Sequence, residues 1–299
     1  MNFADRLHAA VRSKESACLL GLDPHPELLP PPFAAAADPT VPRADRARAI
    51  GDFCCHLVDR LGDRVPAVKP QSAFFELLGA DGAMAWERVV EHARAKGLLV
   101  VADVKRGDIA STATAYAQAH LLDQGVGSKG RADAMTLSPY LGRDTLEPFV
   151  ETCVQADAGA FVLVRTSNPG SSRYQRVGEP PLAERIAADV VELGQRLMGS
   201  SGWSSLGAVV GATHADELAH WRALLPQSIL LLPGYGAQGA TAKDVVPAFG
   251  EGYAGALVAS SRGIAFAYRT KGAPADWLDA ADRALDAMLA DLRGALEQR

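Results

Sequence analysis

The sequence lacks several features that would place it in large functional classes. It has no basic excess, since 30 lysines and arginines face 35 aspartates and glutamates for a net charge of -5, which argues against a dedicated nucleic-acid surface. No run of about 20 apolar residues is present, so we expect no membrane span. The N-terminal 20 residues lack the long apolar core of a secretory signal. These absences predict a cytoplasmic protein with no nucleic-acid partner and no membrane partner.

Cysteine is scarce as well. The four cysteines show no CxxC spacing, and Cys54 and Cys55 stand in a stretch with a helical pattern. The seven histidines form no HExxH motif and no pair at ligand spacing, and no GxSxG motif marks a serine nucleophile. We therefore expect reduced cysteines and no metal site.

What the sequence contains is a repeated alternation of short apolar runs and amphipathic helical patterns. The apolar runs occupy residues 17–22, 65–69, 98–104, 134–137, 160–164, 206–210, 229–232 and 256–259. Such alternation predicts a parallel sheet covered by helices, because parallel neighbours need long crossover connections. Eight units of this kind predict an α/β fold, a (β/α)8 TIM barrel, formed by residues 1–299 as a single domain.

Three segments fall outside this alternation. Residues 24–38, rich in proline and alanine, are predicted as an extended surface loop inserted between the first strand and its helix. Residues 171–181 are predicted as a second long loop after the fifth strand, of a length that is often functional. Residues 274–299 have the pattern of an amphipathic terminal helix.

Polar residues stand at the carboxyl end of nearly every predicted strand. In a barrel these ends gather at one face, where such enzymes place their chemistry. The residues concerned are Asp23, Lys69, Asp103, Lys105, Ser138, Ser167, the glycine-rich segment 234–239 and Arg262.

The third strand carries the most specific of these signals. Asp103 and Lys105 are two positions apart, so their side chains point the same way along a strand. One interpretation is a structural ion pair, with Asp108 capping a helix that begins at Ile109. A functional site is favoured once Asp23 and Lys69 are placed at the same mouth. Burying four charged groups together costs free energy, and a role in binding or catalysis explains why the protein would bear that cost.

The glycine-rich segment predicts a phosphate site. Gly234, Gly236 and Gly239 match GxGxxG between a strand and a helix, but too little chain follows them to complete a dinucleotide-binding domain. Loops after the seventh and eighth strands are the usual phosphate cradle of a barrel. Gln238 has an amide to donate to a phosphate oxygen, and Arg262 can bind one through two hydrogen bonds.

These residues indicate a barrel enzyme acting on a small phosphorylated substrate, with two lysines and several aspartates at the reacting end. A lysine there acts either as a Schiff-base nucleophile or as a proton donor, and spacing does not choose between them. Two other hypotheses stay open. One is a Schiff-base aldolase, or a related decarboxylase, acting on a sugar phosphate, and the other is a catalytically silent nucleotide-binding barrel.

The segment Asp103-Val104-Lys105-Arg106-Gly107-Asp108-Ile109 with Thr112 resembles the signature of orotidine 5′-phosphate decarboxylase. The resemblance extends along the chain and is greatest to the longer bacterial subgroup. Its other motifs are Gly21-Leu22-Asp23-Pro24, Val68-Lys69-Pro70-Gln71, Arg165-Thr166-Ser167-Asn168-Pro169-Gly170, Gln238 and Arg262. The DxKxxD pattern is shared with sugar-phosphate relatives, so Lys69 and the Ser167 loop favour the decarboxylase.

The resemblance implies decarboxylation of orotidine 5′-monophosphate to UMP, the last step of de novo UMP synthesis, without metal or organic cofactor, in a homodimer. By similarity Lys105 donates the proton to C6, and Asp103 lies beside the departing carboxylate. The other roles implied are as follows: Lys69 holds the charges and a ribose hydroxyl, Asp23 accepts from the ribose, Asp108 and Thr112 reach into the partner subunit's site, Ser167 reads the pyrimidine, and Gln238 and Arg262 hold the phosphate.

Overall fold

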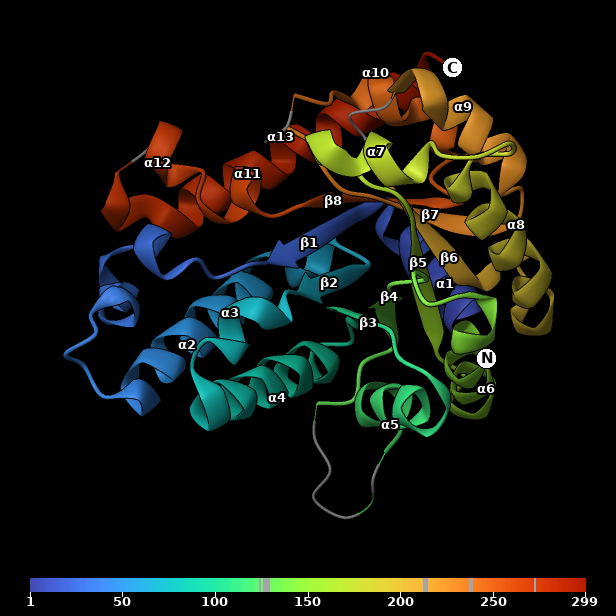
Figure 1. The fold of residues 1–299 in the computed structure, drawn as a ribbon. Coiled ribbons are helices and arrows are strands. Elements are labelled where there is room, and N and C mark those ends of the chain that lie inside the picture. The colour runs from blue at the N-terminus through green and yellow to red at the C-terminus, as the bar shows by residue number, and fades with distance from the viewer. Residues whose placement is uncertain (124, 126–129, 212–214, 237–238, 272) are drawn as a thin grey trace.

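Eight parallel strands form a closed barrel in the computed structural model, which describes residues 1–299 except 124, 126–129, 212–214, 237–238 and 272 (Figure 1). Each strand pairs with the next along the chain, and β8 pairs with β1. The strands are β1 (Cys18–Leu22), β2 (Ala67–Pro70), β3 (Leu99–Arg106), β4 (Ala134–Leu137), β5 (Gly159–Arg165), β6 (Ser204–Val210), β7 (Ser228–Leu232) and β8 (Ala256–Ser260). The predicted TIM barrel is confirmed.

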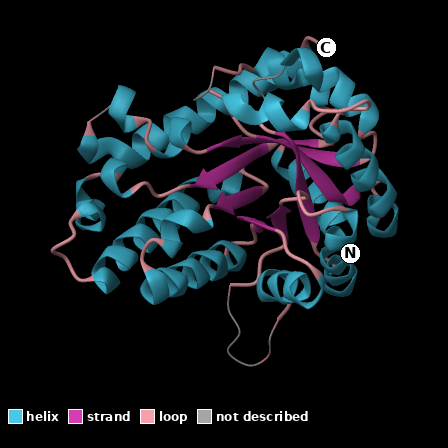
Figure 2. Cartoon of the chain, in the orientation of Figure 1, coloured by secondary structure: helices cyan, strands magenta, loops and turns pink. Residues whose placement is uncertain are grey.

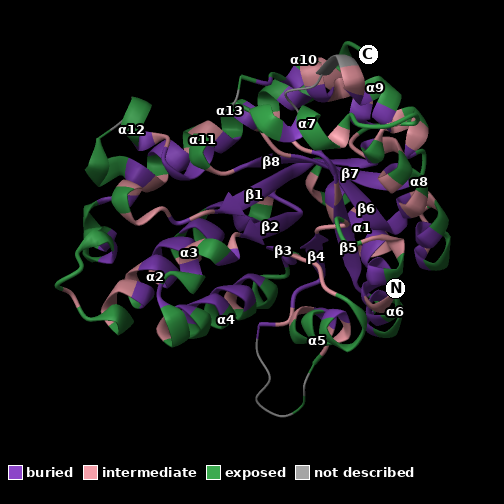
Figure 3. Ribbon diagram, viewed as in Figure 1, coloured by how far each residue is buried: buried purple, intermediate pink, exposed green. Residues whose placement is uncertain are grey.

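Helices surround this barrel, as Figure 2 shows. They are α1 (Phe3–Lys14), α2 (Arg43–Leu61), α3 (Ser72–Glu76), α4 (Gly79–Ala95), α5 (Ala110–Leu121), α6 (Glu147–Ala156), α7 (Ser172–Gln175), α8 (Leu182–Gly194), α9 (Ala215–Leu224), α10 (Ala242–Val245), α11 (Arg262–Ala265), α12 (Tyr268–Lys271) and α13 (Trp277–Glu297). The strands are buried and the outer faces of the helices are exposed (Figure 3). In the described part of the chain no helix is long and apolar enough to cross a membrane.

Alternation along the strands builds the barrel interior. Ala67, Val101 and Ala134 belong to one buried apolar cluster inside the barrel, whereas their neighbours along each strand pack against the helices. Because side chains alternate between the two faces of a strand, the residue two positions later returns to the interior. The next interior layer on β2, β3 and β4 is therefore polar, and it lies at the carboxyl ends of these strands.

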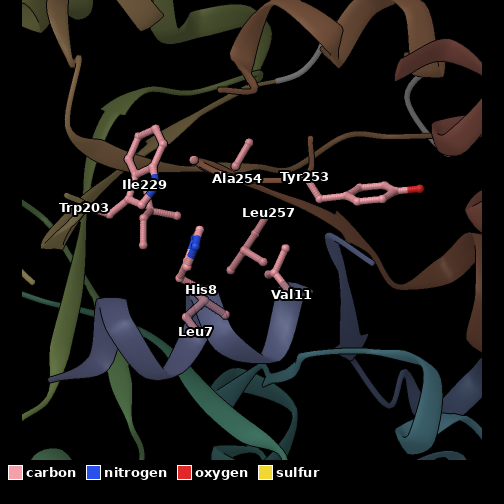
Figure 4. Close-up of a pocket in the computed structure, with 10 residues that line it drawn as sticks. Leu7, His8, Val11, Trp203, Ile229, Tyr253, Ala254 and Leu257 are labelled. Carbon is pink, nitrogen blue, oxygen red and sulfur yellow. The ribbon is translucent and has the colours of Figure 1, made fainter. Parts of the chain in front are cut away.

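Helix α1 closes the opposite end of the barrel. Its Leu7 and Val11 are buried in the same cluster as the interior strand residues. His8 and Val11 point toward Ile229 and Leu257 in Figure 4, and the space left between them is only about 10 Å³. The barrel interior is therefore filled by side chains at this end.

The inserted segment 24–38 is partly different from its prediction. It does lie between β1 and α2, but it forms two 3-10 helices, Pro26–Leu28 and Pro31–Ala37, instead of an extended loop. Its Phe33 is buried and packs edge-on against Phe53 and Trp277. The prolines preset the backbone for a helical turn, and burial of the aromatic ring holds the segment down.

The segment after β5 is also more ordered than predicted. Pro169–Ser171 form a 3-10 turn and α7 follows it, so only residues 176–181 remain irregular. The predicted terminal helix is confirmed as α13, which Arg60 ties to α2 through Asp279 at 2.8 Å. The first and last parts of the helical ring are thereby joined.

All four cysteines are free thiols, as predicted. Burial raises the pKa of Cys18 and of Cys153 to about 12. These two thiols therefore stay protonated and unreactive at neutral pH.

Candidate functional site

Four charged side chains of alternating sign lie in a row at the barrel mouth. The Lys69 ammonium lies 2.5 Å from one carboxylate oxygen of Asp103, and the Lys105 ammonium lies 2.6 Å from the other. Asp23 extends the row, with an oxygen 3.9 Å from the Lys69 nitrogen. We call Asp23, Lys69, Asp103 and Lys105 the charge array. Three strands, β1 through β3, bring its members together, as the sequence predicts.

The Asp103 carboxylate receives two further hydrogen bonds. Gln71 donates its amide to Oδ2 at 3.0 Å, and Thr136 donates its hydroxyl to Oδ1 at 2.9 Å. Together with the two lysines these donors occupy the four positions at which a carboxylate accepts hydrogen bonds. Asp103 is therefore fixed in orientation, which positions both ammonium groups relative to it.

Sequence reasoning missed both Gln71 and Thr136. Every second residue of a strand points to the same side, and this rule would have found both residues. Gln71 is two residues beyond Lys69, and Thr136 is two residues beyond the interior Ala134. The sequence pattern instead favours Ser138, because it follows the predicted end of the fourth strand at Leu137.

Asp103 and Lys69 are both ionised in the folded protein. Burial by itself would raise the pKa of Asp103, but the ammonium groups of Lys69 and Lys105 lower it well below its ordinary value. Burial would lower the pKa of Lys69, yet Asp103 and Asp23 outweigh it and raise that pKa. Opposite charges at contact distance thus keep each other charged despite the loss of solvent.

The Asp103 shift predicts a pH dependence of stability. Because the folded-state pKa is lowered, the ionised carboxylate stabilises the fold at pH values above its ordinary pKa of 3.8. This stabilisation is lost as the pH falls through the folded-state pKa. We expect Asp103→Asn to be less stable than wild type by a constant amount from about pH 5.5 to pH 7, and by less below about pH 4. Urea denaturation across this range measures the difference. A difference that grows on acidification would contradict the assignment.

Lys105 is the member of the array that faces the open mouth. Its side chain is 47% exposed, whereas the Lys69 side chain is 9% exposed. The backbone of Lys105 has a φ of +44°, a left-handed conformation that is uncommon outside glycine. The pairing register of β3 with β4 shifts between Ala102 and Arg106. The strand therefore leaves its regular path where it presents this ammonium group.

A cavity of about 140 Å³ lies between two members of the array, Asp23 and Lys69, and the predicted phosphate residue Arg262. Its lining includes Gly21, Asp23, Lys69, Gly234, Ser260 and Arg262. Arg262 is exposed and is the first residue of α11. A ligand with an anionic group at one end can thus reach from the charge array to this guanidinium. Gln238 lies outside the described residues.

Close approach of β1 to β8 shapes this cavity. A Cβ atom added at Gly21 would stand 2.5 Å from the Cβ of Ser261. Only glycine allows the two strand ends to come this close, so the GLDP motif has a packing reason as well as a chemical one.

The remaining predicted residues lie around the array without joining it. Ser167 is half-buried in the loop after β5, which Gln175 holds by accepting from the Thr166 amide at 2.9 Å. The Asp108 carboxylate accepts from the Ile109 amide at 2.8 Å, and Thr112 is exposed on α5. Helix α5 begins at Ala110 with no side-chain cap, so the alternative that Asp108 caps a helix beginning at Ile109 is wrong.

Among the described residues, no group of three or more histidine, cysteine, aspartate or glutamate side chains is placed to hold a metal ion. The chemistry available from the charge array is electrostatic and acid–base: a fixed carboxylate, a buried ammonium and a second, accessible ammonium group able to donate a proton.

Comparisons of this chain with known proteins, by sequence and by structure, identify the same family. Residues 19–274 match the family described as Orotidine 5'-phosphate decarboxylase / HUMPS. A protein of Rhodopirellula baltica named orotidine 5'-phosphate decarboxylase is 44% identical over 98% of this chain and 100% of its own length. One of the same name from Deinococcus radiodurans is 44% identical over 76% of this chain and 82% of its own.

Among solved structures, the OMP decarboxylase of Leishmania donovani superposes with a TM-score of 0.75 at 33% identity, covering 99% of this chain and 100% of that one. Similarity of sequence and of fold therefore extends over nearly the whole chain.

Proposed function

This chain belongs to the Orotidine 5'-phosphate decarboxylase / HUMPS family, and we propose that it converts orotidine 5′-monophosphate to UMP and CO2 without a cofactor. This is the last step of de novo UMP synthesis. The observation that carries the proposal is the charge array, which ends in an accessible ammonium and whose members Asp23 and Lys69 line a cavity together with Arg262. The Rhodopirellula baltica relative named orotidine 5'-phosphate decarboxylase, 44% identical over 98% of this chain, supports the same substrate.

Lys105 is the proton donor in this proposal. The bond between C6 of the pyrimidine and the carboxylate carbon breaks, CO2 leaves, and the electron pair stays on C6. A proton from the Lys105 ammonium then forms the C6–H bond of UMP. At about 4 Å and an effective dielectric near 20, one ammonium stabilises such a developing charge by roughly 4 kcal/mol. Preorganised charge of this kind lowers the barrier without reorganisation during the reaction.

Asp103 and Lys69 define the field around the reacting carbon. Asp103 lies beside the departing carboxylate, and its repulsion of that group is relieved as CO2 forms. Lys69 balances the Asp103 charge and donates to a ribose hydroxyl. Asp23 accepts a hydrogen bond from the ribose, consistent with its place in the same cavity.

Groups far from C6 supply the binding energy that holds the substrate in this field. Arg262 binds the phosphate, and Gln238, which follows β7 in the sequence, also donates to it. Ser167 reads the polar edge of the pyrimidine from the loop after β5. The family resemblance supports these three roles, and the place of Arg262 after β8 and of Ser167 after β5 agrees with two of them.

A Schiff-base aldolase is less well supported. Its lysine must lose a proton before it attacks a carbonyl. The pKa of Lys69 is raised by Asp103 and Asp23, and Lys105 is ion-paired with Asp103 at 2.6 Å. The Lys69 amine is therefore held in the protonated form, which opposes a nucleophilic role, and the Lys105 nitrogen is engaged in an ion pair that orients it as a donor.

The direct test is incubation of the purified protein with orotidine 5′-monophosphate and EDTA, following the ultraviolet absorbance change on conversion to UMP. We expect turnover in EDTA and no covalent adduct after borohydride is added. Folded protein that shows no turnover, or an adduct trapped with a sugar phosphate, would overturn the proposal.

We further propose a cytoplasmic homodimer in which Asp108 and Thr112 complete the partner subunit's site. Large apolar side chains are exposed beside the mouth, in loops that follow α3, β3 and β4: Leu77 is 69% exposed, Ile109 60% and Tyr140 83%. An apolar surface of this kind favours burial against a second copy. In this proposal residues 1–299 form a single domain in each subunit.

Shared sites predict complementation between two inactive variants. Lys105→Ala and Asp108→Ala alter residues that belong to different subunits of the same site in this proposal. A hybrid dimer then has one site with both changes and one intact site. After mixing at equal concentration under conditions that exchange subunits, we expect activity to rise to about a quarter of the wild-type value. Activity that stays at the level of the separate variants, with subunit exchange demonstrated, would place Asp108 in its own subunit's site.

A further inference from the structure

One buried hydroxyl joins the central carboxylate of the charge array to the backbone that carries the proton donor. Thr136 lies on β4, and 2% of its surface is exposed. Its Oγ1 donates to Oδ1 of Asp103 at 2.9 Å. The same oxygen accepts hydrogen bonds from the amides of Val104 and Lys105, both at 3.0 Å.

These three bonds use the full capacity of the hydroxyl. A threonine side chain has one O–H to donate and two lone pairs to accept with. Two backbone donors fill the lone pairs, so the hydroxyl hydrogen has to point to Asp103. The orientation of the side chain is thereby determined at both ends, and no freedom is left for it to switch partners.

The accepted bonds fall where the backbone of β3 is irregular. Lys105 has a φ of +44°, and the β3–β4 register shifts between Ala102 and Arg106. At this point the amides of Val104 and Lys105 bond to a side chain of β4. A strained conformation persists only when surrounding contacts hold it. The Thr136 oxygen provides two such contacts to consecutive residues.

We propose that Thr136 is a positioning residue that sets the distance between the Asp103 carboxylate and the Lys105 ammonium group. It acts through these two residues and is not assigned a contact with the substrate. The inference rests on the proposed decarboxylase function. A displacement of the donor by even about 1 Å lowers the rate of a step that depends on alignment, so loss of this hydroxyl reduces kcat more than substrate binding.

The test compares Thr136→Val, which keeps the shape but removes the hydroxyl, with Thr136→Ser, which keeps the hydroxyl. We expect Thr136→Val to lower kcat by about 10- to 100-fold, with KM and the Kd for UMP changed by less than about threefold. Thr136→Ser should restore kcat to within about threefold of wild type.

Thr152→Val is the matched control. Thr152 is equally buried, and its hydroxyl donates to the Pro148 carbonyl at 2.9 Å within α6. The Thr152→Val variant loses a hydroxyl that is similarly buried but lies away from the site. Its kcat should therefore equal that of wild type. If Thr136→Val does not fold, Thr136→Ala, which forces no methyl group against the carboxylate, takes its place in the comparison.

The outcomes separate the two proposals. Wild-type protein that does not turn over orotidine 5′-monophosphate would refute the proposed function itself. With active wild type, an unchanged kcat in Thr136→Val, or an equal loss in Thr136→Val and Thr136→Ser, would overturn the positioning role. So would an equal loss in Thr152→Val, because the effect would then be one of general packing.

Discussion

Lys105→Ala is expected to lower kcat by at least about 10⁴-fold while the protein stays folded. The substitution removes both the proton for C6 and the positive charge that stabilises electron density there. Lys105 is half-exposed at the mouth, so its loss leaves no cavity in the core. Steady-state turnover of orotidine 5′-monophosphate measures the loss, and circular dichroism with the Tm establishes the fold.

Lys96→Ala is the control for this variant. Lys96 forms an ion pair with Asp59 at 2.7 Å and is 51% exposed, much like Lys105, but it lies outside the site. We expect it to retain wild-type kcat. Lys105→Ala that keeps more than about a tenth of wild-type turnover would remove Lys105 from the proton-donor role.

Lys69→Met is expected to lower the free energy of unfolding by about 3–5 kcal/mol at pH 7, because it leaves a buried carboxylate without its principal counterion. Asp103 keeps Lys105, but that ammonium lies on the solvent side of the array. The variant should also lose most of its turnover, since the Asp103 charge is no longer balanced. Urea denaturation measures the first effect and the decarboxylation assay the second.

The loss in Lys69→Met should depend on pH. Without Lys69, the pKa of Asp103 is less strongly lowered, so protonation relieves the unpaired charge at a higher pH than in wild type. We expect this pKa to stay below its ordinary value of 3.8 in the variant as well as in wild type. The difference in unfolding free energy from wild type should therefore be constant from pH 7 to about pH 5, and it should shrink only as the pH falls below that ordinary value.

Lys14→Met supplies the comparison. Lys14 is a partly buried lysine on α1 that donates to the Gly62 carbonyl at 2.7 Å and pairs with no buried carboxylate in the described part of the chain. It should show a smaller loss at pH 7. A loss of less than about 1 kcal/mol in Lys69→Met would show that the array is not a tightly coupled buried cluster.

Sequence pattern alone is enough to predict the barrel and the face that carries the site. Eight apolar runs separated by helical patterns leave few arrangements other than a parallel barrel, since each parallel pair needs a crossover helix. Charged residues at the ends of three of these runs, Asp23, Lys69 and Asp103, must then meet at one rim. Alternation along β3 added Lys105 to them. The sequence pattern was sufficient here because the alternation of side chains along each strand and the order of strands and helices determine where each strand ends.

The way in which the array is held depends on contacts that the sequence pattern does not reveal. Gln71 and Thr136 are ordinary polar residues in the sequence, and they matter because strand pairing across the barrel brings them to one carboxylate. The order of segment 24–38 likewise depends on Phe33 meeting Trp277 from the far end of the chain. These contacts join residues distant in sequence, and their partners are set by the closure of the barrel and its helical ring, which local propensity does not encode.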